Sequence, residues 1–167
     1  KKSHPMDVAR TAVSVMGLED KETQDSSQEA NMRKALRIFA KTPTALAAFY
    51  RIRKGKKIIK PKKNLSFAEN FFYMCFGKVP NKEIVKAFDV SLILYAEHSF
   101  NVSTFTARTI TSSLSDIHGA ITGAIASLKG PLHGGANEEV MHMMNKIKKP
   151  ENALKWINNA LDKKEVV

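Results

Sequence analysis

The sequence predicts an all-α protein. Apolar residues recur at three- and four-residue intervals through most of the 167-residue chain, as they do on the buried face of a helix. Capping residues precede many of these stretches, and glycines follow several of them. No stretch shows the strict apolar–polar alternation of a half-buried strand. The length suits one ordinary core, so packed helices are the expected architecture.

The first two expected helices cover residues 3–16 and 27–53. Gly17 is interpreted as the stop of the first helix, and a polar, acidic loop follows it. Ser27 is placed to cap the second helix. Pro43 lies inside that helix, so we expect one kinked helix rather than two separate ones.

A third, Phe-rich helix begins at a capping-box pattern. Ser66 and Glu69 stand at the spacing at which each side chain bonds the other residue's backbone N–H. Gly77 follows the apolar run and predicts a left-handed helix end. The apolar side chains of this helix are expected to lie in the core: Phe71, Phe72, Met74, Cys75 and Phe76.

The second half of the chain predicts further helices with short connections. One opens at Pro80-Asn81 and runs to His98, and the next covers 101–113 with several residues able to cap it. Ser115 is placed to cap a helix over 116–129 that is rich in glycine and alanine. Small residues at this spacing let two helix backbones come close. The last expected helices cover 138–147 and 152–161.

Charge and cysteine content limit the function classes. The net charge is +11 and the pI about 9.8, which admits nucleic acid, an anionic membrane surface or acidic small molecules as partners. The stretch 51–63 is densely basic, but no aromatic residues interleave for base stacking. We interpret it as a solvated loop, with a polyanion-binding module as the alternative. A single cysteine, no bilayer-length apolar run and no signal-peptide core favour a soluble cytoplasmic protein, with no membrane partner.

The stretch 130–137, Gly-Pro-Leu-His-Gly-Gly-Ala-Asn, predicts a tight corner between two helices. Gly134 and Gly135 lack a Cβ, so the backbone there is free to adopt positive φ and to approach a ligand. His133 would stand beside the N–H groups of the following helix, whose positive end favours a neutral imidazole that donates one N–H. Such a ring can polarise a carbonyl. A solvent-facing histidine at a structural turn is the alternative.

Other chemical motifs are absent from the sequence. It holds no phosphate-binding loop, dinucleotide fingerprint, nucleophile elbow or metal-type His/Cys cluster, so no metal site is expected. His118 and His142 are interpreted as structural or surface residues. Lone histidines such as His98, at the end of its expected helix, are more often packing residues than ligands.

The motif GPLHGGANEEV resembles the catalytic turn of the citrate synthase family, which includes the 2-methylcitrate synthases. The stretches HPMDV with RTAVS, and LILYAEHSFN with STFT, are similar to family signatures in the same order, so the resemblance covers about residues 3–160. It implies the all-α citrate synthase fold, with 1–147 as part of the large domain and 148–167 as the start of the small domain. It also implies a fragment of a longer chain.

The family's chemistry is a condensation of acetyl-CoA, or propionyl-CoA, with oxaloacetate to give citrate, or 2-methylcitrate, and CoA. The resemblance implies that His133 hydrogen-bonds the thioester carbonyl and that His98 binds oxaloacetate. Asn101 would order the turn beside His98, and Gly134 and Gly135 would let the backbone approach the substrates. The CoA thioester is a substrate, so no cofactor is expected.

The resemblance also implies a homodimer, whose interface would use helices matching 5–16, 27–53, 116–129 and 136–147. The family's carboxylate base, its second histidine and its substrate-binding arginines have no counterpart in 1–167, so we expect the fragment to be inactive alone. Arg108 lies near the motifs, and an ion pair is its expected role. An inactive scaffold is a further alternative to the enzyme.

Overall fold

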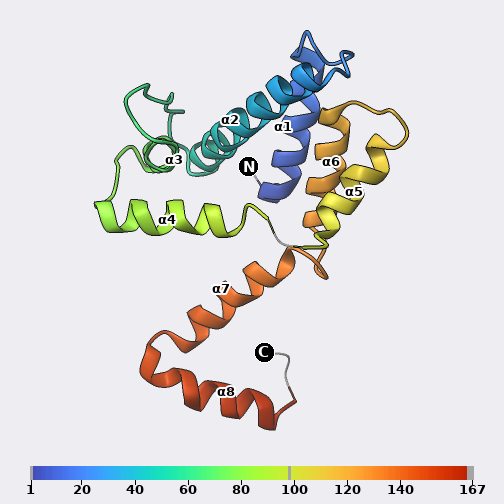
Figure 1. Cartoon of the computed structure of the whole chain (residues 1–167). Helices are drawn as coiled ribbons and strands as arrows, with labels where there is room; N and C mark the ends of the chain where they lie inside the picture. The colour runs from blue at the N-terminus through green and yellow to red at the C-terminus, as the bar shows by residue number, and fades with distance from the viewer. Residues whose placement is uncertain (1, 98, 165–167) are drawn as a thin grey trace. The chain divides into compact units, whose positions relative to one another are not determined.

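The computed structural model describes residues 2–97 and 99–164 (Figure 1). These residues form helices and no strand, which confirms the all-α prediction. The elements are α1 (Pro5–Glu19), α2 (Gln28–Arg53), α3 (Phe67–Phe76), α4 (Lys82–Leu94), α5 (Val102–Thr111), α6 (Ile117–Leu128), α7 (Gly135–Ile147), the short 3-10 helix η1 (Pro150–Asn152) and α8 (Ala153–Asp162).

The chain divides into two compact units, Lys1–Leu128 and Lys129–Val167. In the first unit α6 packs against both α1 and α5, and α2 contacts α1, α3 and α6. Its buried apolar residues are mostly small, as at Ala9, Ala120 and Ala124. Small side chains bring the helix backbones close together, so the stripe predicted on α6 is used for packing inside this chain.

The predicted end of the first helix at Gly17 is wrong. The helix continues through Gly17 to Glu19, because this glycine faces a neighbouring helix rather than a turn. A Cβ at position 17 would lie 3.0 Å from the Cβ of His118 in α6. The glycine is therefore a packing residue where α1 and α6 approach each other.

The local signals in the next two helices are confirmed. Ser27 caps α2 through its side chain, and α2 is one helix with Pro43 inside it. Ser66 and Glu69 complete the capping box of α3, and Gly77 closes that helix with φ +79°. These features depend on hydrogen bonds between near neighbours in sequence, so local sequence was enough to predict them.

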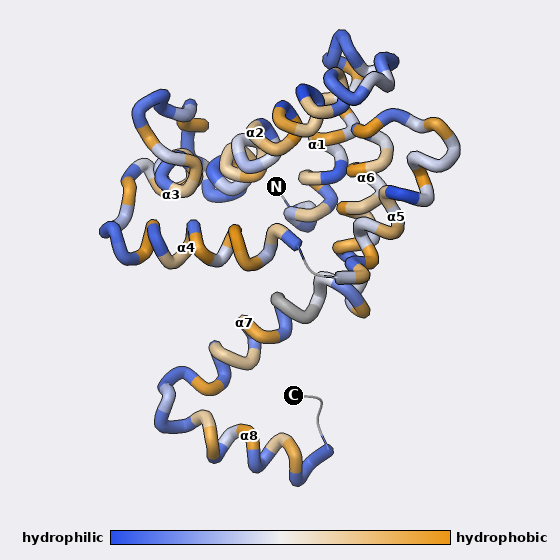
Figure 2. The backbone as a smooth tube through the Cα atoms, viewed as in Figure 1, coloured by the Kyte–Doolittle hydropathy of each residue, from blue (hydrophilic) through white to orange (hydrophobic). Residues whose placement is uncertain are grey.

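The apolar faces of α3 and α4 are less buried than predicted. Met74 and Cys75 are in the core, but Phe76 is half exposed, and α4 has no buried residue and ends at Leu94, before residue 98. Apolar residues recur along α4, between hydrophilic ones (Figure 2). They line an apolar groove of about 870 Å³ whose walls also come from α2, α3 and α6. The groove is open because few residues of this chain cover that face of α4.

The ends of α5 and α6 agree in part with the prediction. Asn101 caps α5, which ends at Thr111. At α6 the backbone N–H of Gly119 donates to Asp116 Oδ1 at 2.9 Å. Asp116 rather than Ser115 is therefore the cap, because its carboxylate is the group that reaches the third N–H of the helix.

The basic stretch 51–63 begins in the last turn of α2 and continues from residue 54 as a loop, which is fastened to α3 at several points. The Arg51 guanidinium donates to the backbone oxygens of Lys57 and Cys75. Asn70 bonds both the N–H and the carbonyl of Lys62 at 2.8 Å, and the Lys62 ammonium lies 4.4 Å from the centre of the Tyr73 ring. Most of its other cations are exposed, as expected for a solvated loop.

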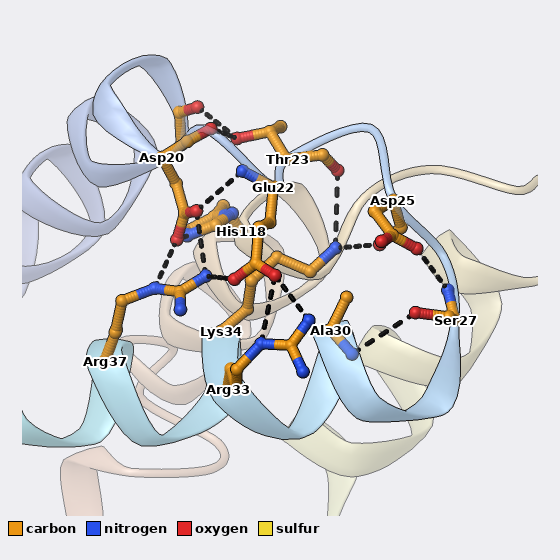
Figure 3. A network of polar contacts seen from close by, with 11 residues as sticks. Asp20, Glu22, Thr23, Asp25, Ser27, Ala30, Arg33, Lys34, Arg37 and His118 are labelled. Atoms are coloured by element: carbon orange, nitrogen blue, oxygen red, sulfur yellow. Dashed lines mark hydrogen bonds and ion pairs between the residues drawn. The ribbon is translucent and has the colours of Figure 1, made fainter.

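A polar network fastens the connection between α1 and α2, which is hydrophilic throughout (Figure 2). The Arg37 guanidinium donates twice to the Asp20 carboxylate, at 2.8 Å each, and once to Glu22 at 2.7 Å (Figure 3). Arg33 also binds Glu22. Lys34 is 1% exposed, and its ammonium donates to the backbone oxygens of Thr23 and Asp25. Two of the three N–H donors of this buried ammonium are thus hydrogen-bonded, which offsets part of the cost of burying its charge.

The second unit holds α7, η1 and α8. In α8 only Ala160 is buried, while Leu154 and Leu161 of its predicted apolar face are exposed. Packing within this chain divides it after Leu128. The expected boundary between the family's large and small domains near residue 147 stays a prediction.

Across the described part of the chain, no helix is both long and apolar enough to cross a bilayer. The same residues hold no group of His, Cys, Asp and Glu side chains arranged to bind a metal ion.

Candidate functional site

The corner before α7 is a turn closed by one carbonyl. The backbone N–H groups of His133 and Gly135 both donate to the oxygen of Gly130, at 3.0 and 3.4 Å. Pro131 and Leu132 lie in the exposed part of this turn. His133 is half-buried and stands just before Gly134, the N-cap of α7. The predicted position of this histidine at the start of a helix is therefore confirmed, within the second unit.

The two glycines of the corner adopt ordinary helical geometry. Gly134 has φ −85° and ψ −10°, and Gly135 is the first residue of α7, so neither position uses the positive φ that glycine permits. The helix simply begins earlier than expected. A Cβ on Gly135 would lie 3.7 Å from Gly130 O, an ordinary van der Waals contact. Packing inside the unit therefore does not require glycine at position 135.

As the N-cap of α7, Gly134 leaves the first N–H groups of the helix without a capping side chain. A serine or aspartate at that position would accept hydrogen bonds from the first N–H groups of the helix, and glycine has no side chain that can do so. The N-terminus of α7 carries the partial positive charge of its unsatisfied N–H groups. Beside it, His133 supplies an imidazole. This combination suits a group that gains negative charge during a reaction.

Asn101 lies in the first unit, at the start of α5. Its side-chain oxygen accepts a hydrogen bond from the Thr104 N–H at 3.1 Å, which holds the carboxamide at the helix end. Phe100, the residue before it, has φ +59°, a conformation that costs a non-glycine residue about 1–3 kcal/mol. No pattern in the sequence predicted this strain. It marks the segment around Asn101 as one that the fold holds in a demanding geometry.

A cavity of about 470 Å³ adjoins this segment. Its polar lining residues are Glu97, Asn101, Thr104 and Arg108, and its apolar ones include Phe100 and Phe105. The predicted ion pair of Arg108 is not found with any acidic side chain in the described residues. Sequence reasoning did not associate Thr104 and Arg108 with a site, although their spacing from Asn101 on a helix was a signal that could have found them.

Two further histidines and the single cysteine lie outside the proposed site. His118 is buried and His142 lies on an exposed face of α7, as predicted for structural and surface residues. Burial raises the pKa of the Cys75 thiol, so this cysteine is a poor nucleophile at neutral pH. His98, predicted to bind substrate, lies outside the described residues. Asn101 belongs to the first unit, and His133, Gly134 and Gly135 belong to the second.

Comparison with known proteins places the chain in a family. Residues 1–167 match the family described as "Citrate synthase, C-terminal domain". The chain is 55% identical to "2-methylcitrate synthase 2" of Corynebacterium glutamicum over 172 residues, which cover 100% of this chain and 45% of the relative. It is 53% identical to "Citrate synthase" of Mycolicibacterium smegmatis over 164 residues, covering 98% of this chain and 44% of the relative.

A solved structure agrees with these relatives. It is a ternary complex of carboxymethyl coenzyme A and oxaloacetate with citrate synthase from Thermoplasma acidophilum. It matches 95% of this chain and 41% of its own chain, with a TM-score of 0.79 and 31% sequence identity. The chain belongs to the citrate synthase family. It spans less than half the length of these relatives.

Proposed function

We propose that the complete protein condenses an acyl-CoA thioester with oxaloacetate, giving citrate from acetyl-CoA or 2-methylcitrate from propionyl-CoA, and free CoA. The observation that carries the proposal is the turn at 130–135, which places His133 at the uncapped N-terminus of α7. Membership of the family supports it, as do the names of the relatives. The Thermoplasma acidophilum complex contains a coenzyme A derivative and oxaloacetate, which correspond to the two substrates of the proposed reaction.

The chemistry of the proposed reaction explains why a donor is needed at this turn. A base removes a proton from the carbon beside the thioester carbonyl, and negative charge develops on the carbonyl oxygen. The His133 ring donates its N–H to that oxygen, and the partial positive charge at the start of α7 stabilises the same charge. The enol carbon then attacks the ketone of oxaloacetate, and water cleaves the thioester to release CoA.

The other assigned residues act on the second substrate. In the proposed site His98 donates an N–H to oxaloacetate, and Asn101 holds the turn beside it. Gly134 and Gly135 leave the start of α7 without side chains, so that the substrates can come near the backbone. The reaction needs no resident cofactor, because CoA arrives and leaves as part of a substrate.

Whether the acyl group is acetyl or propionyl is a difference of one methylene, which a pocket discriminates by about 1–3 kcal/mol. Relatives of both names are similar to this chain. Initial rates of the complete protein with each thioester, at the same oxaloacetate concentration, decide between the two. The polyanion-binding alternative is not favoured by these relatives.

We further propose that the complete protein is a cytoplasmic homodimer. The faces of α1 and α6 that meet each other are used inside this chain, so a subunit interface would have to use other faces of α1, α2, α6 and α7. The molecular mass of the complete protein in solution, measured by light scattering, tests the dimer, and a monomer at micromolar concentration would contradict it.

Replacing His133 by alanine tests the proposed function. Loss of one donor to a developing oxyanion lowers kcat by about 10²- to 10³-fold. The measurement is CoA release by the complete protein with oxaloacetate and either thioester. His142→Ala is the matched control, because it removes an exposed histidine from α7 itself and should leave the rate unchanged. Normal turnover by the His133 variant would remove the basis of the proposal and favour the scaffold alternative.

A further inference from the structure

One face of α5 carries an unexplained set of polar groups. Thr104, Phe105 and Arg108 lie three, four and seven residues after Asn101, so the four residues share one side of the helix. All of them line the cavity of about 470 Å³ at the start of α5. The cavity is therefore lined both by Asn101, the N-cap of α5, and by Arg108 from its last turn.

Among the residues that the structure describes, none is a partner that explains the charge of Arg108. Its side chain is exposed, and it forms no ion pair or side-chain hydrogen bond with any residue that the structure describes. Glu97 lines the same cavity but does not pair with it. An arginine in this state presents its full fork of N–H donors, which matches the two oxygens of a carboxylate or phosphate.

Thr104 differs from the threonines around it. The hydroxyls of Thr106, Thr109 and Thr111 donate to backbone oxygens four residues earlier, at 2.9 to 3.0 Å. The corresponding residue for Thr104 is Phe100, which lies outside the helix at φ +59°. The Thr104 hydroxyl makes no hydrogen bond within the described residues, so its donor is available to the cavity.

The aromatic walls of the cavity would strengthen the hydrogen bonds that Arg108 and Thr104 donate to a bound anion. The rings of Phe100 and Phe105 are largely exposed and line the same space. A ligand that covers them removes water from the cavity, and hydrogen bonds to a charged group become stronger when water is excluded. Exposed aromatic rings around a cation suit a ligand with an anionic group and an apolar or planar part.

We propose that Arg108 and Thr104 bind an oxyanion group of a substrate in this cavity, next to Asn101. The inference rests on the proposed function, which supplies two ligands with such groups: the carboxylates of oxaloacetate and the phosphates of the acyl-CoA. Arg108 binds two oxygens of the group, and the Thr104 hydroxyl donates to one of them. Both residues belong to the first unit, Lys1–Leu128. The proposed site therefore uses no residue of the second unit.

Steady-state kinetics of the complete protein test the proposal. Arg108→Gln removes the charge, Arg108→Lys keeps it without the fork, and Thr104→Val replaces the hydroxyl by a methyl group. The KM for each substrate is measured with the other at saturation. A lost charge-assisted pair raises one KM by about tenfold or more, with a smaller rise in the lysine and valine variants and little change in kcat.

The two KM values distinguish the source of the oxyanion. A rise confined to oxaloacetate identifies a carboxylate, and a rise confined to the acyl-CoA identifies a phosphate. For the second case, a thioester of dephospho-CoA shows whether the 3′-phosphate is the bound group: the KM difference between the wild type and Arg108→Gln then disappears.

Arg53→Gln is the matched control. Arg53 is also an exposed arginine in the last turn of a helix, far from this cavity in sequence, and its loss should change neither KM. Unchanged KM values in all three variants, or an equal change in the Arg53 control, would overturn the proposal. That result is distinct from failure of the proposed function, in which the unaltered complete protein would not condense its substrates at all.

Discussion

His118 occupies a closed position between α1, α2 and α6, with a carboxylate near each ring nitrogen. Its Nε2 lies 3.5 Å from Asp20 Oδ2, and its Nδ1 lies 3.7 Å from Asp116 Oδ1. The side chain is 2% exposed. Burial lowers the pKa of His118; Asp20 and Asp116 oppose this effect, and the cations Lys34 and Arg37 add to it. The net result is a pKa below the ordinary value of 6.5.

The lowered pKa predicts a pH dependence of stability. Below pH 6.5 the unfolded chain protonates this histidine while the folded chain holds it neutral, so the unfolded state binds more protons. The free energy of unfolding should therefore decrease as the pH falls through 6.5 toward the folded-state pKa. Urea unfolding at pH 7.5, 6.5 and 5.5 measures it, and His118→Gln should flatten the dependence.

A second histidine provides the control for this effect. His142→Gln removes an exposed side chain and should leave the slope with pH unchanged; equal slopes in the wild type and His118→Gln would contradict the assignment.

Asp20 affects the free energy of unfolding at a lower pH than His118 does. The hydrogen bonds from Arg37 hold the pKa of Asp20 below 3.8, so the stability that Asp20 contributes is present above that pH and is lost below it.

At the scale of elements, the contact between α5 and α6 depends on Gly123. A Cβ at this position would lie 2.2 Å from Ile110 Cδ1, closer than any real contact. The two helices therefore pack at a distance that only glycine permits unless the isoleucine moves. This is the tight contact that the small residues of α6 predicted, and its partner is α5 of the same chain.

Gly123→Ala should destabilise the first unit by about 1–3 kcal/mol, the usual effect of overpacking. Ile110→Val removes the Cδ1 atom that clashes, so the double variant should recover most of the loss, which a double-mutant cycle measures. Gly119→Ala is the control in the same helix, because its Cβ would meet the Ser115 hydroxyl at 3.1 Å, a group able to rotate away. Additive effects of the Gly123 and Ile110 changes would contradict the predicted contact.

Several helix starts in this protein were predictable, whereas the starts of α6 and α7 and some helix ends were not. The caps Ser27, Ser66, Asn81 and Asn101 act through hydrogen bonds to residues three positions ahead, which the sequence displays directly. Gly17 was misinterpreted because its role is set by His118, a residue of another helix. A glycine that stops a helix and one that permits close packing look the same in sequence.

At the scale of the whole molecule, the residues that we assign to the proposed reaction belong to two units of the chain, each described by itself. The segment of Asn101 and Arg108 belongs to Lys1–Leu128, and the turn of His133 belongs to Lys129–Val167. The chain spans less than half of its relatives. Our prediction that the family's base, second histidine and substrate-binding arginines have no counterpart among residues 1–167 follows from the family resemblance and stays a prediction.

Residues 1–167 by themselves should therefore produce no measurable citrate or 2-methylcitrate. The test measures CoA release from acetyl-CoA and propionyl-CoA by this polypeptide, with the complete protein assayed beside it. Circular dichroism should show a helical chain, so that inactivity is not caused by failure to fold. Product formation by the isolated polypeptide would show that the groups we regard as missing are not required.

The sequence by itself determined that this protein is helical, where most helices begin and which family it belongs to. Those properties depend on periodicity, capping residues and motifs that lie within a few positions of one another. Only the tertiary structure decided that α1 runs through Gly17, that Asp116 caps α6, and that Arg108 lines a cavity and forms no ion pair with an acidic residue in 2–97 or 99–164. Each of these depends on which atoms of distant segments come together, because packing distance and the pairing of charges are properties of the folded chain.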